Sequence, residues 1–481
     1  MTATLLPDIN LDDPQNEWIG TRHLDPAGRV MRHGDHYVRA VYRDQVPFFQ
    51  HLLDSGVIDA LTQQGLILEH EHALISHARY GMLLRAKAAP WRIYGARYTF
   101  DALKDSALAW LEINRILSDH GLQLYDAHFG NFVFYKNRPH WVDLGSIVPP
   151  ETGDGLRQFL HKFVYPLILF VHKPGFSARR AEPFHTGVTR KAAMRALGRH
   201  GRRNWNEEQS RALWKTEELP RQTALAILTE IIGALHLKQP DTTWSGYRNE
   251  GALNRALSMD PLELREDRRD EMVLKTVMSC KPTRILDVGA NDGFHSILYA
   301  RQGCEVLALD RDEFAINKLY SWARSRPHLK LSSTVDDFAT TLHQASTVVS
   351  LALTHHLAIH GKMDFDFISR RYAQMSTGSL IVEFMPNGIG STVAKPDPLP
   401  AHYSLDAFLS GLRRFFDQVE VVAYERPAQM SVRTLIKCTG RNSVDAGLSE
   451  KRGAQPPARV RENRLQGLLR CIIRVWHGRK G

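Results

Sequence analysis

The spacing of apolar residues divides the chain into four stretches. Between residues 265 and 440, short apolar runs alternate with amphipathic stretches of helical period, which is typical of buried parallel strands joined by helices. The strand candidates are 284–288, 305–309, a short run before residue 335, 347–353, 379–383, 419–424 and 434–438. The pattern predicts an α/β fold with a Rossmann-like, seven-stranded sheet.

Residues 21–250 mix short strands with long helices and predict a separate α+β domain. Alternation around the turn residues Gly34 and Asp35 predicts a hairpin over Gly28–Tyr42. Helices are expected at 45–65, 100–120, 156–171, 189–200 and 206–236, and strands at 131–135 and 140–144. Residues 1–20 are acidic and lack an apolar segment, so they are predicted to be a loose leader and not a secretory signal.

The final stretch, 441–481, consists of a polar linker and one short amphipathic segment. Apolar residues recur there on one helical face: Leu465, Leu468, Leu469, Ile472, Ile473 and Trp476. A basic helix of this kind can lie on an anionic membrane surface through residues 464–480, or can dock on the protein's own core or on a partner. The sequence leaves these alternatives open.

Positive charge is concentrated in that tail. The net charge is +10, and from Lys451 onwards nine Lys/Arg accompany a single acid, so the rest of the chain is close to neutral. A second basic run at 179–203 holds eight Lys/Arg and one acid, without an RNA-binding motif of interleaved aromatic residues. We interpret it as a solvated helix and loop, and nucleic acid is not expected as a partner.

Cysteine usage and hydropathy bear on the compartment. None of the four cysteines forms a CxxC pair, so neither a zinc site nor a disulfide framework is predicted. No run reaches the ~18 consecutive apolar residues of a bilayer-spanning helix. A cytoplasmic location is expected, and the inner membrane face is the surface that the tail would contact if it binds membrane and does not dock on protein.

The first two strands of the seven-stranded sheet carry a ligand-binding pattern. The strand RILDV is followed by a glycine turn and a helix, and the second strand ends in an acid. Glycines let the backbone approach a ligand closely, and a carboxylate at the second strand's end can accept both ribose hydroxyl hydrogens. The acid at the end of the first strand can bind the cationic end of a ligand, such as an amino group. The cofactor-binding candidates are Asp287, Gly289, Ala290, Asn291, Gly293 and Asp310.

The segment LDVGANDG closely resembles the first motif of class I S-adenosylmethionine (SAM) methyltransferases. Asp310 stands where the ribose-binding acid of that family lies. The alternative is a generic Rossmann-like turn that binds NAD or no ligand, but the G-x-G-x-x-G spacing of dinucleotide-binding folds is absent. The resemblance implies SAM as cofactor, and it implies that the last two strand candidates form the antiparallel hairpin that closes the sheet. It also implies an acid near the third strand that contacts the adenine amino group. Asp336 and Asp337 both fit that place, and a helix N-cap is the alternative role.

Three residues are candidates for chemistry. Methyl transfer requires mainly that the acceptor be held near the methyl carbon, and a hydroxyl acceptor also benefits from a base. Thr354-His355-His356 follows the fourth strand, so His355 and His356 are the first candidates for that base and Glu383, at the end of the fifth strand, is the second. The alternative is that the histidines only pack and line the pocket. No N/D-P-P-Y/F motif follows the fourth strand, so an amide or adenine nitrogen target of that kind is not supported.

The α+β region holds a second constellation. Asp126 stands five residues before Asn131, and Asp143 follows in an apolar strand and precedes Leu-Gly. This resembles the catalytic loop and metal-binding DxG of kinases and aminoglycoside phosphotransferases, in which these residues align a hydroxyl and hold magnesium. However, no glycine-rich loop or strand lysine accompanies it, and Arg39 is the nearest cation. A kinase-like scaffold with lost or altered catalysis is favoured over an active phosphotransferase, and coincidence is the remaining alternative.

Taken together, the two regions resemble a bacterial family of two-part SAM-dependent methyltransferases that includes proteins associated with nodulation and surface polysaccharides. The resemblance covers about residues 20–438 and rests on phrases such as LALTHHL and IVEFMP. The sequence departs from the family in Leu124-Tyr125, where Leu-Lys often precedes the Asp, and in its basic tail. The resemblance implies O-methylation of a saccharide or other small molecule. Alternatives are a phosphotransferase and a non-catalytic SAM-binding scaffold.

Overall fold

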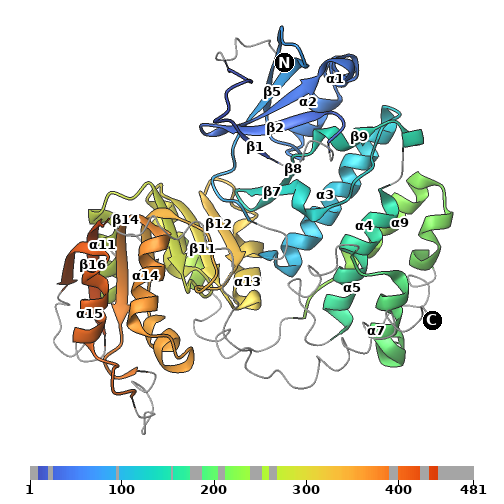
Figure 1. Ribbon diagram of the computed structural model, residues 1–481. Helices are drawn as coiled ribbons and strands as arrows, with labels where there is room; N and C mark the ends of the chain where they lie inside the picture. Colours follow the sequence, from blue (N-terminus) through green and yellow to red (C-terminus); the bar gives the residue numbers. More distant parts are fainter. Residues whose placement is uncertain are drawn as a thin grey trace, which may run out of the picture. The chain divides into compact units, whose positions relative to one another are not determined.

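The computed structural model describes residues 9–19, 25–93, 97–152, 155–173, 187–203, 212–238, 252–258, 268–388, 399–422 and 433–442 (Figure 1). The chain up to Arg441 forms one compact unit, and residues from Asn442 form a second. The predicted tail segment 464–480 lies outside the described residues. Within the described part, no helix is both long and apolar enough to cross a bilayer.

An antiparallel sheet of five strands opens the chain, in the order β1-β2-β3-β5-β4. Its members are β1 (Glu17–Ile19), β2 (Gly28–His33), β3 (His36–Tyr42), β4 (His70–Leu74) and β5 (Tyr80–Lys87). The predicted hairpin is confirmed as β2 and β3, with Gly34 at φ +59° in its turn. Two features differ from the expectation: β1 lies inside the predicted leader, and β4 and β5 were not predicted.

Helices and two small hairpins follow the sheet. The expected helix 45–65 is two helices, α1 (Val46–Asp54) and α2 (Val57–Gln63), because Gly56 takes φ +75° between them. Helix α3 (Phe100–Asp119) is confirmed, capped by the Thr99 side chain. The later elements of this region are β6 (Gln123–Leu124), β7 (Phe132–Tyr135), β8 (Arg138–Trp141), β9 (Ile147–Val148), α4 (Leu156–Phe159), α5 (Tyr165–His172), α7 (Arg190–Arg203) and α9 (Arg221–Ala234). A π-helical turn, Leu160–Val164, joins α4 to α5.

The second half contains the predicted seven-stranded sheet, in the order β12-β11-β10-β13-β14-β16-β15. Its strands are β10 (Arg284–Val288), β11 (Glu305–Asp310), β12 (Leu331–Val335), β13 (Ala345–Ser350), β14 (Ser376–Phe384), β15 (Phe416–Val422) and β16 (Thr434–Arg441). The first five pair in parallel, while β16 runs antiparallel to both β14 and β15. The Rossmann-like prediction and its closing hairpin are therefore confirmed. Strand β13 ends at Ser350, three residues earlier than predicted.

Helices flank this sheet, as expected for strands that bury both faces. They are α10 (Ala252–Ser258), α11 (Arg268–Ser279), α12 (Phe294–Arg301), α13 (Glu313–Ala323), α14 (Phe365–Met375) and α15 (Leu405–Arg413), with a π-helical turn at His356–His360. The central strands β10 and β11 are buried along most of their length, and their apolar side chains contribute alternately to a core on each side of the sheet.

Polar contacts join the N-terminal region to the sheet domain. The Asn317 side chain of α13 donates to Asp101 of α3 at 3.0 Å, and Arg324 pairs with Asp105 at 2.8 Å. The Asn137 amide donates to the Leu331 carbonyl of β12 at 2.6 Å. The two predicted regions thus share an interface within one compact unit.

Candidate active site

The glycine turn between β10 and α12 has the backbone shape that its sequence predicts. Gly289 and Gly293 have φ near +79° and +81°, and Asn291 also lies in the left-handed region at +51°. A Cβ on Gly293 would stand 2.4 Å from Leu319, so only glycine fits there. The N–H groups of Gly289 and Ala290 both donate to the Leu309 carbonyl, at 2.8 and 3.0 Å. These bonds fix the turn against the end of β11.

Asp310 lies at that end and faces the turn. Its Oδ2 accepts the Asn291 N–H at 2.9 Å, and its Oδ1 accepts the Asp312 N–H at 2.8 Å. Burial raises the pKa of Asp310, and the N–H donors act in the opposite direction. Each carboxylate oxygen retains capacity for a further hydrogen bond, as a ribose diol requires.

Asp287, at the tip of β10, is buried with 3% of its surface exposed. The Ser296 hydroxyl, one turn into α12, donates to its Oδ2 at 2.6 Å. The two acids predicted at the first and second strand ends therefore border the same turn.

Asp336 and Asp337 follow β12, and the structure separates their roles. Asp336 is buried and forms an ion pair with Arg97 of the N-terminal region. Asp337 is half-buried: its Oδ1 accepts the Ala339 N–H at 2.8 Å and its Oδ2 pairs with Arg311 at 3.1 Å. Asp337 thus caps a turn, whereas the alternative role was that of a helix N-cap, and it is the more accessible of the two carboxylates.

The histidines lie just past β13. His355 is 6% exposed, and its ring centroid is 4.0 Å from that of His356. The pKa of His355 is lowered to about 3, mainly by burial and to a smaller extent by the neighbouring His356 and Arg433. Burial and His360 lower the pKa of His356, whose Nδ1 is 3.4 Å from the Nδ1 of His360. Both rings are neutral at pH 7, and His356 is the more accessible.

Glu383, the second candidate for the base, lies among arginine side chains. Its carboxylate is fully buried and accepts hydrogen bonds from Arg269 at 2.8 and 2.9 Å and from Arg433 at 2.8 Å. Two guanidinium groups therefore bind this carboxylate through charge-assisted hydrogen bonds. We assign Glu383 a structural role. Neither arginine was identified from the sequence, because residues 269, 383 and 433 are far apart in the chain.

The constellation in the N-terminal region also assembles. The Asn131 amide donates to Asp126 at 2.9 Å, and Arg39 donates from Nη2 to Asp143 at 2.9 Å. The same guanidinium pairs through Nη1 with Asp25, which was not predicted. Burial raises the pKa of Asp143, with Asp25 and Asp126 adding to the shift and Arg39 opposing it. Among the described residues, no group of three or more His, Cys, Asp or Glu side chains is arranged to hold a metal ion.

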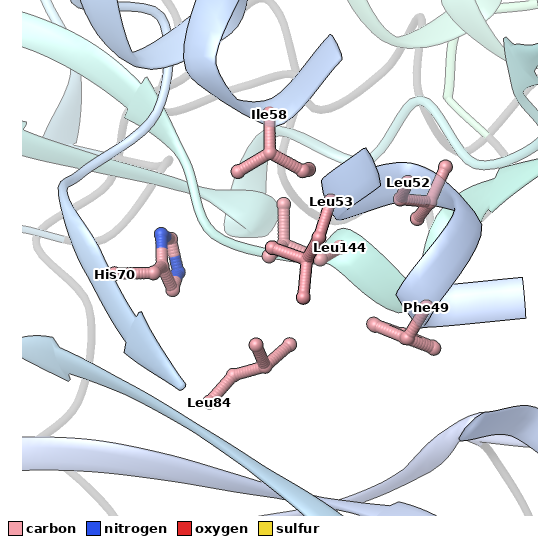
Figure 2. Close-up of a pocket in the computed structure, with 7 residues that line it drawn as sticks. All are labelled: Phe49, Leu52, Leu53, Ile58, His70, Leu84 and Leu144. Carbon is pink, nitrogen blue, oxygen red and sulfur yellow. The ribbon is translucent and has the colours of Figure 1, made fainter. Parts of the chain in front are cut away.

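A small cavity lies beside this constellation (Figure 2). It is lined by Phe49, Leu52, Leu53, Ile58, His70, Leu84 and Leu144. His70 is the one polar lining residue, and burial lowers its pKa to about 4, so it is uncharged at neutral pH. The cavity therefore offers no charged group that would orient a polar ligand.

No protein-family model matches the chain. The chain is 23% identical over 437 residues to the nodulation protein NoeA of Rhizobium meliloti (strain 1021), a match that covers 81% of this chain and 90% of that protein. The predicted resemblance to nodulation-associated proteins is confirmed by this match, which is long enough to extend into both predicted regions.

Solved structures give partial likenesses. Magnesium protoporphyrin IX methyltransferase from Synechocystis PCC 6803, with bound SAM, is 13% identical over 41% of this chain and 91% of its own, at a TM-score of 0.29. N-methyltransferase NodS from Bradyrhizobium japonicum WM9 is 14% identical over 37% and 97%, also at 0.29. The bifunctional kinase-methyltransferase WbdD is 16% identical over 37% and 39%, at 0.28.

Proposed function

We propose that the chain is a SAM-dependent methyltransferase that methylates a hydroxyl group of a saccharide or other small molecule. The observation that carries the proposal is the arrangement at the end of β11, where Asp310 is held against the glycine turn by the Asn291 N–H. A carboxylate and a glycine turn whose backbone can contact a ligand closely thus lie together at the carboxyl ends of the parallel strands. Ligands of such sheets bind at these ends.

The donor fits the residues present. SAM supplies an electrophilic methyl group on a sulfonium. Asp310 binds the ribose hydroxyls, and Asp287 provides a negative charge for the cationic methionine end. Asp337 is the accessible acid for the adenine amino group, because its side chain is 33% exposed and that of Asp336 is 4% exposed. The positive φ values at Gly289 and Gly293 let the turn fold tightly against the end of β11, so that its backbone can approach the cofactor closely.

His356 is the candidate to accept the hydroxyl proton. A neutral imidazole can take up a proton, and its lowered pKa keeps it unprotonated at pH 7. His355 is more buried and a weaker base, since its pKa is about 3, so we assign it to the wall of the acceptor pocket. Most of the rate enhancement would come from holding the acceptor in line with the methyl carbon.

The test is calorimetric titration of S-adenosylhomocysteine (SAH) into the full chain and into Asp310→Asn. The wild type is expected to bind in the micromolar range and Asp310→Asn at least about tenfold more weakly, which corresponds to about 1.4 kcal/mol. Asp364→Asn is the matched control, because Asp364 caps α14 and lies outside the site. A folded wild type that does not bind SAH would contradict the proposal. A positive result justifies a screen of saccharide acceptors with methyl-labelled SAM.

A second candidate function rests on the assembly of Asp126, Asn131 and Asp143, which resembles a phosphotransferase site. Arg39 already neutralises Asp143, which argues against magnesium binding there. Magnesium-dependent binding or hydrolysis of ATP would establish this alternative. SAH binding without transfer to any acceptor would favour the third hypothesis, a SAM-binding scaffold.

We also propose a cytoplasmic location with peripheral contact to the inner membrane face through residues 464–480. Support comes from the basic and apolar pattern of that segment. The test is co-sedimentation with anionic vesicles after deletion of residues 457–481. Vesicle binding that survives the deletion would contradict the proposal.

A further inference from the structure

The segment that joins β5 to α3 packs against the seven-stranded sheet. Arg284, at the start of β10, donates to the Pro90 carbonyl, and its guanidinium lies 4.2 Å from the centre of the Trp91 ring. Trp91 is buried and contacts the His343 ring edge-to-face, with centroids 6.3 Å apart. The N-terminal region is thus anchored next to the loop that follows β12.

Arg97, in the same segment, reaches the carboxylate of Asp336. The Asp336 side chain is 4% exposed, so its charge requires a partner. His343 is the other basic side chain nearby, with Nε2 4.0 Å from Asp336. Burial lowers the pKa of His343 to about 4, so at neutral pH it carries no charge. The compensating positive charge therefore comes from Arg97.

Asp336 connects this ion pair to the cofactor site. Its Oδ1 accepts the Asp337 N–H at 2.7 Å, and its own N–H donates to the Asp310 carbonyl at 2.9 Å. A carboxylate held on one side by Arg97 thus fixes the backbone of Asp337 on the other. The chain of contacts runs from the N-terminal region, through Asp336, to the acid assigned to the adenine amino group.

We propose that Arg97 is a positioning residue for the adenine end of the SAM site, acting through Asp336 on Asp337. The inference rests on the proposed function. It gives the N-terminal region a role in methyl-donor binding that requires no nucleotide chemistry of its own.

The experiment measures dissociation constants for SAH and for its inosine analogue, in which oxygen replaces the adenine 6-amino group. The full-length variants are Arg97→Ala, Arg97→Lys and Asp337→Asn, with Arg324→Ala as the control. Arg324 forms an ion pair across the same interface, with Asp105, but between α3 and α13. Arg97→Lys retains the positive charge, so the two dissociation constants can still be measured with this variant if Arg97→Ala does not fold.

Arg97→Ala is expected to weaken SAH binding about tenfold and to remove most of the preference for SAH over the inosine analogue. Arg97→Lys should give a smaller loss in the same direction, and Arg324→Ala a change of less than about twofold. The double variant Arg97→Ala/Asp337→Asn should lose less SAH affinity than the product of the two single fold-losses. The reason is that both substitutions act on the contact of Asp337 with the adenine amino group.

Three results would overturn the inference. Unchanged SAH affinity and preference in the Arg97 variants would do so while leaving the proposed function intact. Equal losses in Arg324→Ala would show that only the interface as a whole matters. A folded wild type that binds no SAH would remove the proposed function, and the inference with it.

Discussion

The molecule holds two partly buried aspartates that the sequence places in ligand-binding motifs, and their surroundings differ. Asp310 accepts hydrogen bonds from the backbone N–H groups of Asn291 and Asp312, and no cation among the described residues pairs with it. Asp143 is paired with the Arg39 guanidinium, which also holds Asp25. Burial raises the pKa of both carboxyl groups.

The difference shows what each site can accept. A carboxylate held by backbone donors keeps its charge and spare lone pairs for a hydroxyl ligand. When a carboxylate is paired with an internal guanidinium, that guanidinium neutralises the negative charge that a magnesium ion would otherwise neutralise. The sheet site is therefore suited to a ligand. In the N-terminal site, the Arg39 guanidinium takes the place that a bound cation would have.

The largest effect is expected for Arg39→Met. Removing the guanidinium leaves two acids uncompensated, and the free energy of unfolding should fall by about 3 kcal/mol, the low end of the range for breaking a buried ion pair, because both acids are partly exposed. Manganese should then raise the melting temperature of the variant but not of the wild type. Thermal and urea unfolding with and without Mn²⁺ test this.

Arg85→Met is the matched control, since it removes an ion pair with Glu71 between neighbouring strands of the same sheet. It should cost less stability and show no response to manganese. If the wild type itself binds Mn²⁺ tightly, Arg39 does not fill the site and the comparison between the two aspartates fails.

His356→Gln is expected to lower kcat by about a hundredfold with an acceptor found in the screen, in the range typical of general-base removal. Asp126→Asn should leave kcat within about twofold if transfer does not use the N-terminal site. Steady-state methyl-transfer assays provide the measurement. A large loss in Asp126→Asn would link the two sites chemically and break the contrast between them.

The pH dependence of SAH binding should follow Asp310. Its ionised form accepts the ribose hydroxyl hydrogens, and its pKa is raised by burial. Affinity should therefore decline as pH falls, and the decline should begin at a higher pH than an ordinary aspartate would give. Titrations from pH 7.5 down to the limit of stability should show this slope in the wild type and a flat profile in Asp310→Asn.

Arg311→Ala should have the smallest effect. The Arg311 side chain is 74% exposed, so its ion pair with Asp337 is screened by solvent. SAH affinity is expected to change by less than about 1 kcal/mol. A loss as large as that of Arg97→Ala would mean that Asp337 is positioned from the solvent side and not through Asp336.

The sequence predicted the parts of the fold that depend on neighbouring residues. The glycine turn with Asp310, the hairpin around Gly34 and the apolar parallel strands all carry local signals, and the structure contains them. The break at Gly56 carried a signal that was overlooked, since a glycine inside a helical pattern can end the helix.

Pairings between distant residues were beyond sequence reasoning. Strands β4 and β5 carry histidines and charges in place of a clear alternation, so their pairing with β3 gave no local pattern. The contacts of Arg97 with Asp336 and of Arg269 with Glu383 join residues more than a hundred positions apart. Such pairs decide which acid remains available to contact a ligand, and only the three-dimensional structure reveals these pairs.

The most direct measurement of the central claim is a parallel calorimetric titration of SAH into the wild type, Asp310→Asn and Asp143→Asn. The account predicts micromolar binding that Asp310→Asn weakens at least about tenfold, about 1.4 kcal/mol, while Asp143→Asn leaves it unchanged. The opposite pattern, or no binding by a folded wild type, would contradict the assignment of the methyl-donor site to the seven-stranded sheet.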